Sequence, residues 1–313
     1  MWTESTSARK QIGDYRFRRL TIDLTQARVR QETVVCADLE DFLGGIGRAF
    51  KLLGAYRVSD PFAPEVPLIM NTGVFTGTDL MTGLRVFFSG YSPLKVAKNG
   101  RPLAMWSAAS GKFGTKLAAT GADEVIFTGR AARPVYLVIG SQGGTPTVAF
   151  EDATELLGKT THEKILWLAD RYPDAHMAVL GPAGEHWSQN YYAAIACSTV
   201  NELQSRDCKP RFAGRGGMGS LMGSKNLIAI VAQAPRSQAR QAGPLAAGGQ
   251  SGNQPRRRLA QLPRSRQGRR RRRHLAQRGR PCTPWGRCPR KTSGRRATTS
   301  RWPFTAARSN KIT

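Results

Sequence analysis

The last 78 residues of this chain contain no aspartate or glutamate, which limits the folded part of the protein to what precedes them. Residues 236–313 hold 22 of the 48 lysines and arginines, and residues 1–235 hold the other 26 with all 21 acidic residues. The net charge of +27 therefore divides into +22 for the tail and only +5 for the front part. A segment dominated by Arg, Gly, Pro, Gln and Ser buries too little apolar surface to offset its ordering entropy. We expect a folded domain over residues 1–235 and a disordered Arg-rich tail over residues 236–313.

The tail allows two interpretations. Five consecutive arginines at 269–273 are typical of a basic arm that binds nucleic-acid phosphates without sequence preference. The alternative is out-of-frame translation of a GC-rich gene, because codons rich in G and C encode Arg, Pro, Gly and Ala. We favour the frameshift, because the segment without acidic residues begins shortly after an intact Gly-rich motif at residues 211–230.

Cysteines and hydropathy indicate a reducing compartment. The five cysteines are few, odd in number and widely spaced, so they predict no disulfide framework. The N-terminal residues contain no apolar signal segment, and no apolar run reaches the roughly 18–20 residues that span a bilayer. We expect a soluble, cytoplasmic protein.

Surface or structural roles are expected for the histidines, which are His162, His176, His186 and His274. Buried packing is expected for three of the cysteines, which are Cys36, Cys197 and Cys208.

Strand and helix signals alternate irregularly along the front part. Short apolar runs bounded by turn residues predict strands at residues 15–24, 67–71, 84–91, 124–128, 134–139, 177–180 and 227–231. Helical spacing predicts helices at residues 38–56, with a Gly-rich break, and at residues 110–121 and 161–172. Without strict βαβ alternation the fold class is α+β, with mixed β-sheets and helices, rather than a doubly wound sheet. The front part is expected to be one large domain or two fused half-units.

Residues 211–230, RFAGRGGMGSLMGSKNLIAI, hold five glycines before a helix start and an apolar strand. Glycines let backbone N–H groups approach a phosphate, and Arg211, Arg215 and Lys225 would add cationic partners. A tight structural turn explains the glycines equally well. Two nucleotide motifs are excluded: the G-x-G-x-x-G match follows no hydrophobic strand and precedes no suitable acidic residue, and the order Gly-Ser-Lys inverts the end of a P-loop.

This string resembles the signature R-x-A-G-R-G-G-x-G-x-x-M-G-S-K-N-L-x-A-I of the aldehyde ferredoxin oxidoreductase family. The resemblance covers most of residues 15–231, in the family's order, through residues 44–48 (GGIGR), 73–78 (GVFTGT), 82–85 (TGLR), 111–114 (GKFG), 129–131 (GRA) and 181–185 (GPAGE). It implies the family's N-terminal, pterin-binding domain.

The resemblance also implies an oxidoreductase chemistry. Family members oxidise aldehydes to carboxylic acids on a tungsten or molybdenum bis-pterin cofactor and pass electrons through a four-iron four-sulfur cluster to ferredoxin. Because pterin dithiolenes hold the metal, this domain needs no metal ligand. It implies no membrane partner and leaves a homodimer open.

The resemblance assigns the cofactor contacts residue by residue. Arg85 occupies a pterin-phosphate position, and the second Gly-rich loop contributes Arg211, Phe212, Gly214 and Arg215. Ala108 and Ser110 lie where the family has an N-x-G-G turn, although this sequence reads Ala-Ala-Ser-Gly there. No catalytic residue is assigned.

Three departures from the family bear on activity. Residues 95–108 form a longer loop than usual, and residues 201–209 resemble an insertion. Cys282 and Cys288 do not match the family's C-x-x-C-x-x-x-C cluster motif. We therefore expect a truncated fragment that is inactive alone. The alternatives are a pterin-domain remnant that acts as a binding module and a basic nucleic-acid-binding protein.

Overall fold

The structure is a computed structural model that describes residues 16–35, 39–77 and 83–234. The expectations for the tail, for Cys36 and for His274 lie outside these described residues. Within them, no helix is long and apolar enough to cross a membrane.

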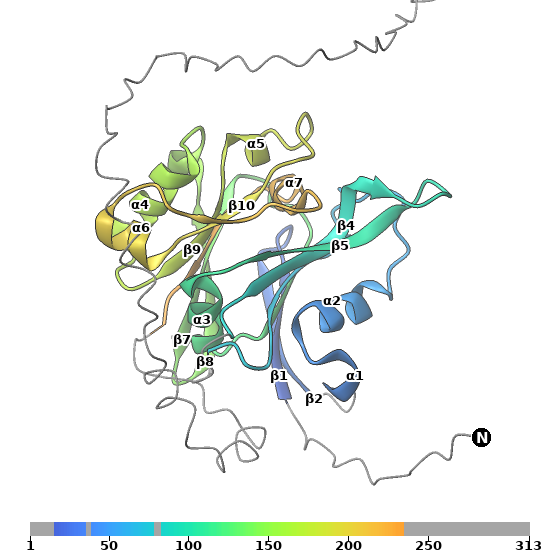
Figure 1. The fold of residues 1–313 in the computed structure, drawn as a ribbon, viewed down its shortest axis with the longest axis horizontal. Coiled ribbons are helices and arrows are strands. Elements are labelled where there is room, and N and C mark those ends of the chain that lie inside the picture. Colours follow the sequence, from blue (N-terminus) through green and yellow to red (C-terminus); the bar gives the residue numbers. More distant parts are fainter. Residues whose placement is uncertain (1–15, 36–38, 78–82, 235–313) are drawn as a thin grey trace, which may run out of the picture. The chain divides into compact units, whose positions relative to one another are not determined.

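The first half of the described chain builds one six-stranded sheet with strand order β2-β1-β6-β3-β4-β5. Figure 1 labels β1, β2, β4 and β5 of this sheet. Strands β1 and β6 are parallel, and the other neighbours are antiparallel. Its elements are β1 (Arg16–Asp23), β2 (Arg28–Val35), α1 (Leu39–Phe42), α2 (Gly45–Leu53), β3 (Leu68–Thr72), β4 (Val86–Val96), β5 (Pro102–Ala109), α3 (Lys112–Ala119) and β6 (Glu124–Thr128).

The second half builds another six-stranded sheet, with order β11-β10-β9-β12-β7-β8. Here β12 and β7 are parallel, and the other neighbours are antiparallel. Its elements are β7 (Val135–Gln142), β8 (Thr145–Asp152), a 3-10 turn (Thr154–Leu156), α4 (Thr161–Arg171), β9 (His176–Leu180), α5 (Pro182–Glu185), β10 (Ile195–Cys197), α6 (Val200–Ser205), β11 (Arg211–Ala213), α7 (Met218–Ser224) and β12 (Leu227–Ala232).

The two sheets have the same topology. Read from the opposite edge, the second sheet runs β8-β7-β12-β9-β10-β11, so each strand of the first half corresponds to the strand six places later. In each half the first and last strands pair in parallel, and a helix precedes the last strand: α3 in the first half and α7 in the second. The described chain is therefore built from two fused half-units, one of the two arrangements that the sequence left open.

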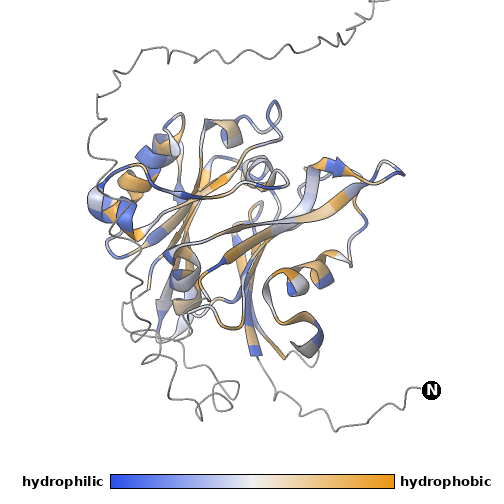
Figure 2. Ribbon diagram, in the orientation of Figure 1, coloured by the Kyte–Doolittle hydropathy of each residue, from blue (hydrophilic) through white to orange (hydrophobic). Residues whose placement is uncertain are grey.

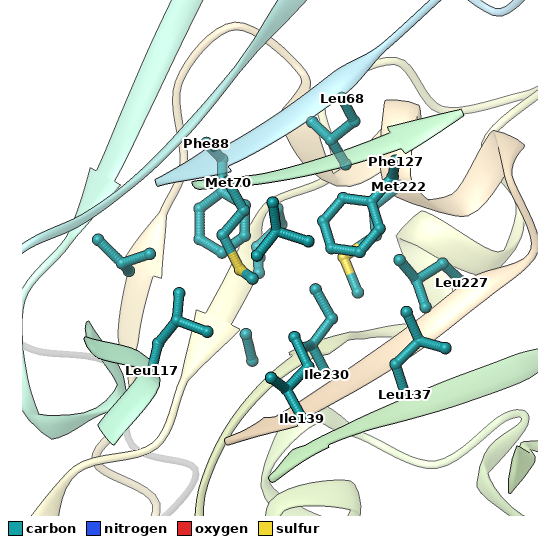
Figure 3. Packing of buried hydrophobic residues seen from close by; sticks show 14 of the residues in the cluster. Leu68, Met70, Phe88, Leu117, Phe127, Leu137, Ile139, Met222, Leu227 and Ile230 are labelled. Carbon is teal, nitrogen blue, oxygen red and sulfur yellow. The ribbon is translucent and has the colours of Figure 1, made fainter. Parts of the chain in front are cut away.

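The main hydrophobic core lies between the two sheets. Period-two alternation decides which residues enter it: in β9, Ala178 and Leu180 face the shared core while Met177 and Val179 face α4. Figure 3 shows side chains from both sheets meeting in this core, among them Leu68, Met70, Phe88, Phe127, Leu137, Ile139, Leu227 and Ile230. Apolar residues are accordingly concentrated on the strands (Figure 2).

The structure confirms the α+β class, and each predicted strand and helix is present within the described residues. The helical spacing of the apolar residues over 38–56 does not predict which of them are buried. Leu53 is buried, but Leu43 is 57% exposed and Phe50 is 37% exposed, while Arg48 and Ala49 are buried instead. The reason is the break between α1 and α2, where Leu43 has a φ of 43° and the helical spacing starts afresh.

Candidate functional site

The residues assigned to cofactor binding lie on three neighbouring segments. In the ladder between β4 and β5, Val86 pairs with Ala109 and Phe87 pairs with Ala108. Arg85 and Ser110 are the next residues beyond this pairing, so the first sheet brings Arg85, Ala108 and Ser110 to one end of one strand pair. Two segments separated by more than twenty residues therefore form one side of the site.

The Gly-rich loop after β11 forms the other side. Strand β11 is an edge strand of the second sheet and lies against β5, which is an edge strand of the first. The backbone N–H of Arg215 donates a hydrogen bond of 2.9 Å to Oγ of Ser107, a buried residue of β5. Nothing in the sequence distinguished Ser107, because an isolated serine in a strand carries no motif. This hydrogen bond attaches the loop that holds Gly214 and Arg215, directly after Phe212 of β11, to the strand that holds Ala108.

The two sides occupy corresponding places in the two half-units. One is the connection from β5 to α3, and the other is the connection from β11 to α7. Each connection ends in a glycine with positive φ at the helix N-cap: Gly111 with a φ of 115° and Gly217 with a φ of 72°. The site is therefore lined by equivalent loops of a duplicated topology.

Three exposed arginines supply positive charge. The guanidinium groups of Arg85, Arg211 and Arg215 make no hydrogen bond or ion pair with any other residue in the described ranges. Phe212, which follows Arg211 in β11, is 53% exposed. Free guanidinium groups pair bidentately with phosphate oxygens, and an exposed ring suits a flat heterocycle. The site thus has the chemistry to hold a planar ligand with phosphate groups.

The glycines of the connection from β11 to α7 and of α7 itself separate into two classes. An added Cβ at Gly219 would lie 2.5 Å from the carbonyl oxygen of Ala193, and at Gly223 it would overlap the carbonyl oxygen of Gly184. These two glycines, like Gly217 beside Tyr191, are required by packing within the protein. Gly214 is different, because it is exposed and an added Cβ would meet only the Cβ of Ala194, at 3.9 Å. A close approach by a ligand gives a reason for glycine at 214 that the protein's own contacts do not.

Two sequence interpretations are wrong at this site and near it. Lys225 is no phosphate partner, because its side chain is 3% exposed and its Nζ donates to the carbonyl oxygens of Pro64 and Gly129 at 3.0 and 3.4 Å. Burial lowers the pKa of Lys225 to about 8, with Arg130 adding to the effect. Cys208 is exposed and not a packing residue, because it lies in the turn after α6, whereas Cys197 is buried in β10 as expected.

His176 is buried, which confirms the structural role expected for it, and its surroundings lead to a prediction about stability and pH. Burial lowers its pKa to about 4, Lys116 and Lys112 add to this, and its Nδ1 lies 2.9 Å from Oγ of Ser198. As the pH falls below 6.5, His176 binds a proton in the unfolded state but stays neutral in the folded state until the pH approaches 4. The free energy of unfolding therefore decreases as the pH falls. We expect a loss of roughly 3 kcal/mol between pH 7 and pH 4 from this group.

Urea unfolding at several pH values measures this loss. The His176→Gln variant should show a flatter dependence between pH 6.5 and 4.5 than the unaltered chain. His186→Gln, at an exposed position, serves as the matched control and should keep the original slope. Equal slopes for the His176→Gln variant and the unaltered chain would contradict the prediction.

Comparison with known proteins places most of the described chain in one family. Residues 19–234 match the family described as aldehyde ferredoxin oxidoreductase, N-terminal domain. The chain is 36% identical over 220 residues to a tungsten-containing aldehyde ferredoxin oxidoreductase of Pyrococcus abyssi, which covers 68% of this chain and 32% of that protein. It is 31% identical over 238 residues to the WOR-like subunit of an aliphatic sulfonate oxidoreductase of Pyrococcus furiosus, covering 70% of this chain and 34% of that protein.

A solved structure shares the fold. The active site complex BamBC of benzoyl coenzyme A reductase, in complex with 1,5 dienoyl-CoA, matches with a TM-score of 0.59 and 30% sequence identity. The match covers 70% of this chain and 31% of that one. The chain spans about a third of the length of the relatives it matches.

Proposed function

Because the chain belongs to the aldehyde ferredoxin oxidoreductase family, as its N-terminal domain, we propose that it is the base on which a bis-pterin cofactor with tungsten or molybdenum lies. The tungsten in the names of several relatives favours that metal. In the proposed whole enzyme, which is cytoplasmic, an aldehyde is oxidised to a carboxylic acid and electrons pass through a four-iron cluster to ferredoxin.

One observation carries the proposal: the site is formed by equivalent connections of two equivalent half-units. A ligand with two similar halves matches a site that presents two corresponding loops, β5 to α3 and β11 to α7. The free guanidinium groups of Arg85, Arg211 and Arg215 supply the counter-charge for its phosphates.

The residues of this chain bind and orient the cofactor. The arginines would hold phosphate oxygens through paired N–H donors, and the exposed Phe212 would offer an apolar contact. Gly214 leaves room for the ring system to approach the backbone, while Ser107 fixes the loop against β5. When bound, the cofactor supplies the metal and the dithiolene sulfurs at which the redox chemistry takes place.

The relatives suggest that this domain does not select the substrate. Proteins named for aldehydes, for aliphatic sulfonates and for benzoyl coenzyme A each match this chain over about a third of their own length. A domain common to enzymes with such different substrates is suited to holding a cofactor that these enzymes share. We propose that substrate selection depends on other parts of the enzyme.

Bound pterin in the purified chain tests the proposal. After expression in a host that makes the tungsten cofactor, denaturation releases the pterin, whose fluorescence after oxidation gives the amount per chain. Charge-assisted hydrogen bonds contribute about 1.5–3 kcal/mol each, so Arg215→Gln should weaken retention by about 10- to 100-fold. Combining it with Arg85→Gln and Arg211→Gln should abolish retention.

The matched control removes the same charge elsewhere. Arg28→Gln, Arg57→Gln and Arg101→Gln alter three exposed arginines outside the site and should retain the pterin. Both triple variants should unfold at the same urea concentration as the unaltered chain, since all six side chains are exposed. Absence of pterin from the unaltered chain, or equal retention in both triple variants, would contradict the proposal.

A further inference from the structure

Three side chains with metal-binding atoms meet on the second half-unit, at the outer helices. They are His162 at the start of α4, Glu202 in α6 and Cys208 in the turn that follows α6. One ligand atom from each lies within 4.8 Å of the other two. Helices α4 and α6 lie side by side (Figure 1). The cluster is thus formed by tertiary structure and follows no sequence motif.

One carboxylate oxygen of Glu202 in this cluster has no hydrogen-bond partner among the described residues. Its side chain is fully buried, and its Oε1 lies 2.9 Å from Nδ1 of His162. Its Oε2 is buried and has no hydrogen-bond partner in the part of the chain that the structure describes. A buried carboxylate oxygen without a partner costs about 1–3 kcal/mol or more, so a ligand is expected there.

From this arrangement we propose that His162, Glu202 and Cys208 form a binding site for a divalent metal ion of the zinc class. Zinc combines thiolate, imidazole and carboxylate ligands, whereas magnesium and calcium bind oxygen ligands. In a tetrahedral zinc site with bonds of about 2.0–2.3 Å, ligand atoms lie roughly 3.3–3.8 Å apart. Because Cys208 is exposed, a small movement of its side chain closes the remaining distance.

Local contacts hold the turn of Cys208 in place. On one side, Arg206 donates two hydrogen bonds of 2.9 Å to Asp170 of α4, and its carbonyl oxygen lies 3.1 Å from Nε2 of His162. On the other side, the hydroxyl of Thr199 donates to the carbonyl oxygen of Lys209 at 3.0 Å. The turn is therefore attached both before and after Cys208.

The charges around the cluster permit a cation. The two basic side chains of the turn are each neutralised, Arg206 by Asp170 and Lys209 by Asp207 at 2.7 Å. On metal binding the Cys208 thiol gives up its proton, and the Glu202 carboxylate and a neutral His162 ring complete the ligand set. Three protein ligands leave a fourth position open for water.

Cobalt titration of the full chain tests this site. Metal is first removed with a chelator, and Co²⁺ is then added, followed by Zn²⁺ in competition. We expect one Co²⁺ per chain with a thiolate-to-cobalt charge-transfer band, which Zn²⁺ displaces. Cys208→Ser should lose the band, and Cys208→Ser and Glu202→Gln should each bind at least about 10- to 100-fold more weakly, the cost of altering even an outer-shell partner.

The double variant Cys282→Ser and Cys288→Ser is the matched control, because it removes two thiols that are not among the proposed ligands and should keep both the band and the affinity. If burial makes Glu202→Gln unstable, Cys208→Ser still decides, because its side chain is exposed. The proposal is overturned if the unaltered chain shows no thiolate-to-cobalt band, or if Cys208→Ser retains it.

Discussion

Replacing Gly223 with alanine is expected to destabilise the chain by more than about 4 kcal/mol, or to prevent folding. Alanine gains about 1 kcal/mol over glycine in a helix interior, and Gly223 lies in α7. That gain is outweighed because the new Cβ would overlap the carbonyl oxygen of Gly184, a backbone atom of α5 that no rotamer change can move. Urea unfolding, or the yield of soluble chain, measures the effect.

Gly214→Ala, in the connection that leads from β11 to α7, is the matched control. Its backbone is not in the left-handed region and the nearest atom to its added Cβ lies 3.9 Å away, so stability should stay within about 1 kcal/mol or rise slightly. If Gly214 is kept open for the proposed cofactor, this variant should nevertheless lose bound pterin. A stable Gly223→Ala variant would contradict the packing argument. A stable Gly214→Ala variant with full pterin would contradict only the cofactor argument.

Glu124→Gln is expected to cost about 3–5 kcal/mol of stability. The Glu124 carboxylate is fully buried and accepts hydrogen bonds from Nε of Arg19 at 2.9 Å and Nε of Arg48 at 3.3 Å. The neutral amide removes the charge that faces both guanidinium groups, where water reaches them poorly. Free energies from urea unfolding give the change directly.

Glu32→Gln provides the comparison, because Glu32 pairs with the same Arg19 at 2.8 Å but is 28% exposed. Exposed ion pairs contribute about 0–1 kcal/mol, so this variant should stay close to the unaltered chain. Equal losses for the two glutamine variants would show that burial of Glu124 does not determine its contribution.

The sequence predicted the interior elements well because their signal is local. β6, β9 and β12 are buried throughout or nearly so, and short apolar runs between turn residues mark such strands. The family string predicted the Gly-rich loop and its helix. The resemblance to the family is confirmed by the match over residues 19–234.

The edge strands β2 and β8 were missed because neither has a continuous buried face. β2 has no fully buried residue, and β8 has only Pro146. The hairpin between β7 and β8 did leave a signal, since Gly143 and Gly144 both have positive φ, as a two-residue turn between strands requires. Pairing between distant strands, and hence the duplicated topology, has no local signature.

The candidate site was only partly predictable. The arginines and Gly214 could be assigned by resemblance, but the reason for each glycine could not, because it depends on which backbone approaches it in three dimensions. Lys225 was misassigned for a similar reason: its carbonyl partners at Pro64 and Gly129 are far away in the sequence. The roles of the three arginines and of Gly214 in cofactor binding remain predictions.

The position of the last strand in each half-unit has a consequence for folding kinetics. β6 enters between β1 and β3, and β12 enters between β7 and β9, so the central strand of each sheet is the last to be synthesised. The strands on either side of this last strand pair with it and not with each other, so they stay unconnected until it is in place. The parallel pairing also requires closure of a loop of about a hundred residues. Such high contact order slows folding. Each half-unit therefore becomes a complete sheet in a single late step, and an interruption before Leu227 would leave the second sheet divided at its centre.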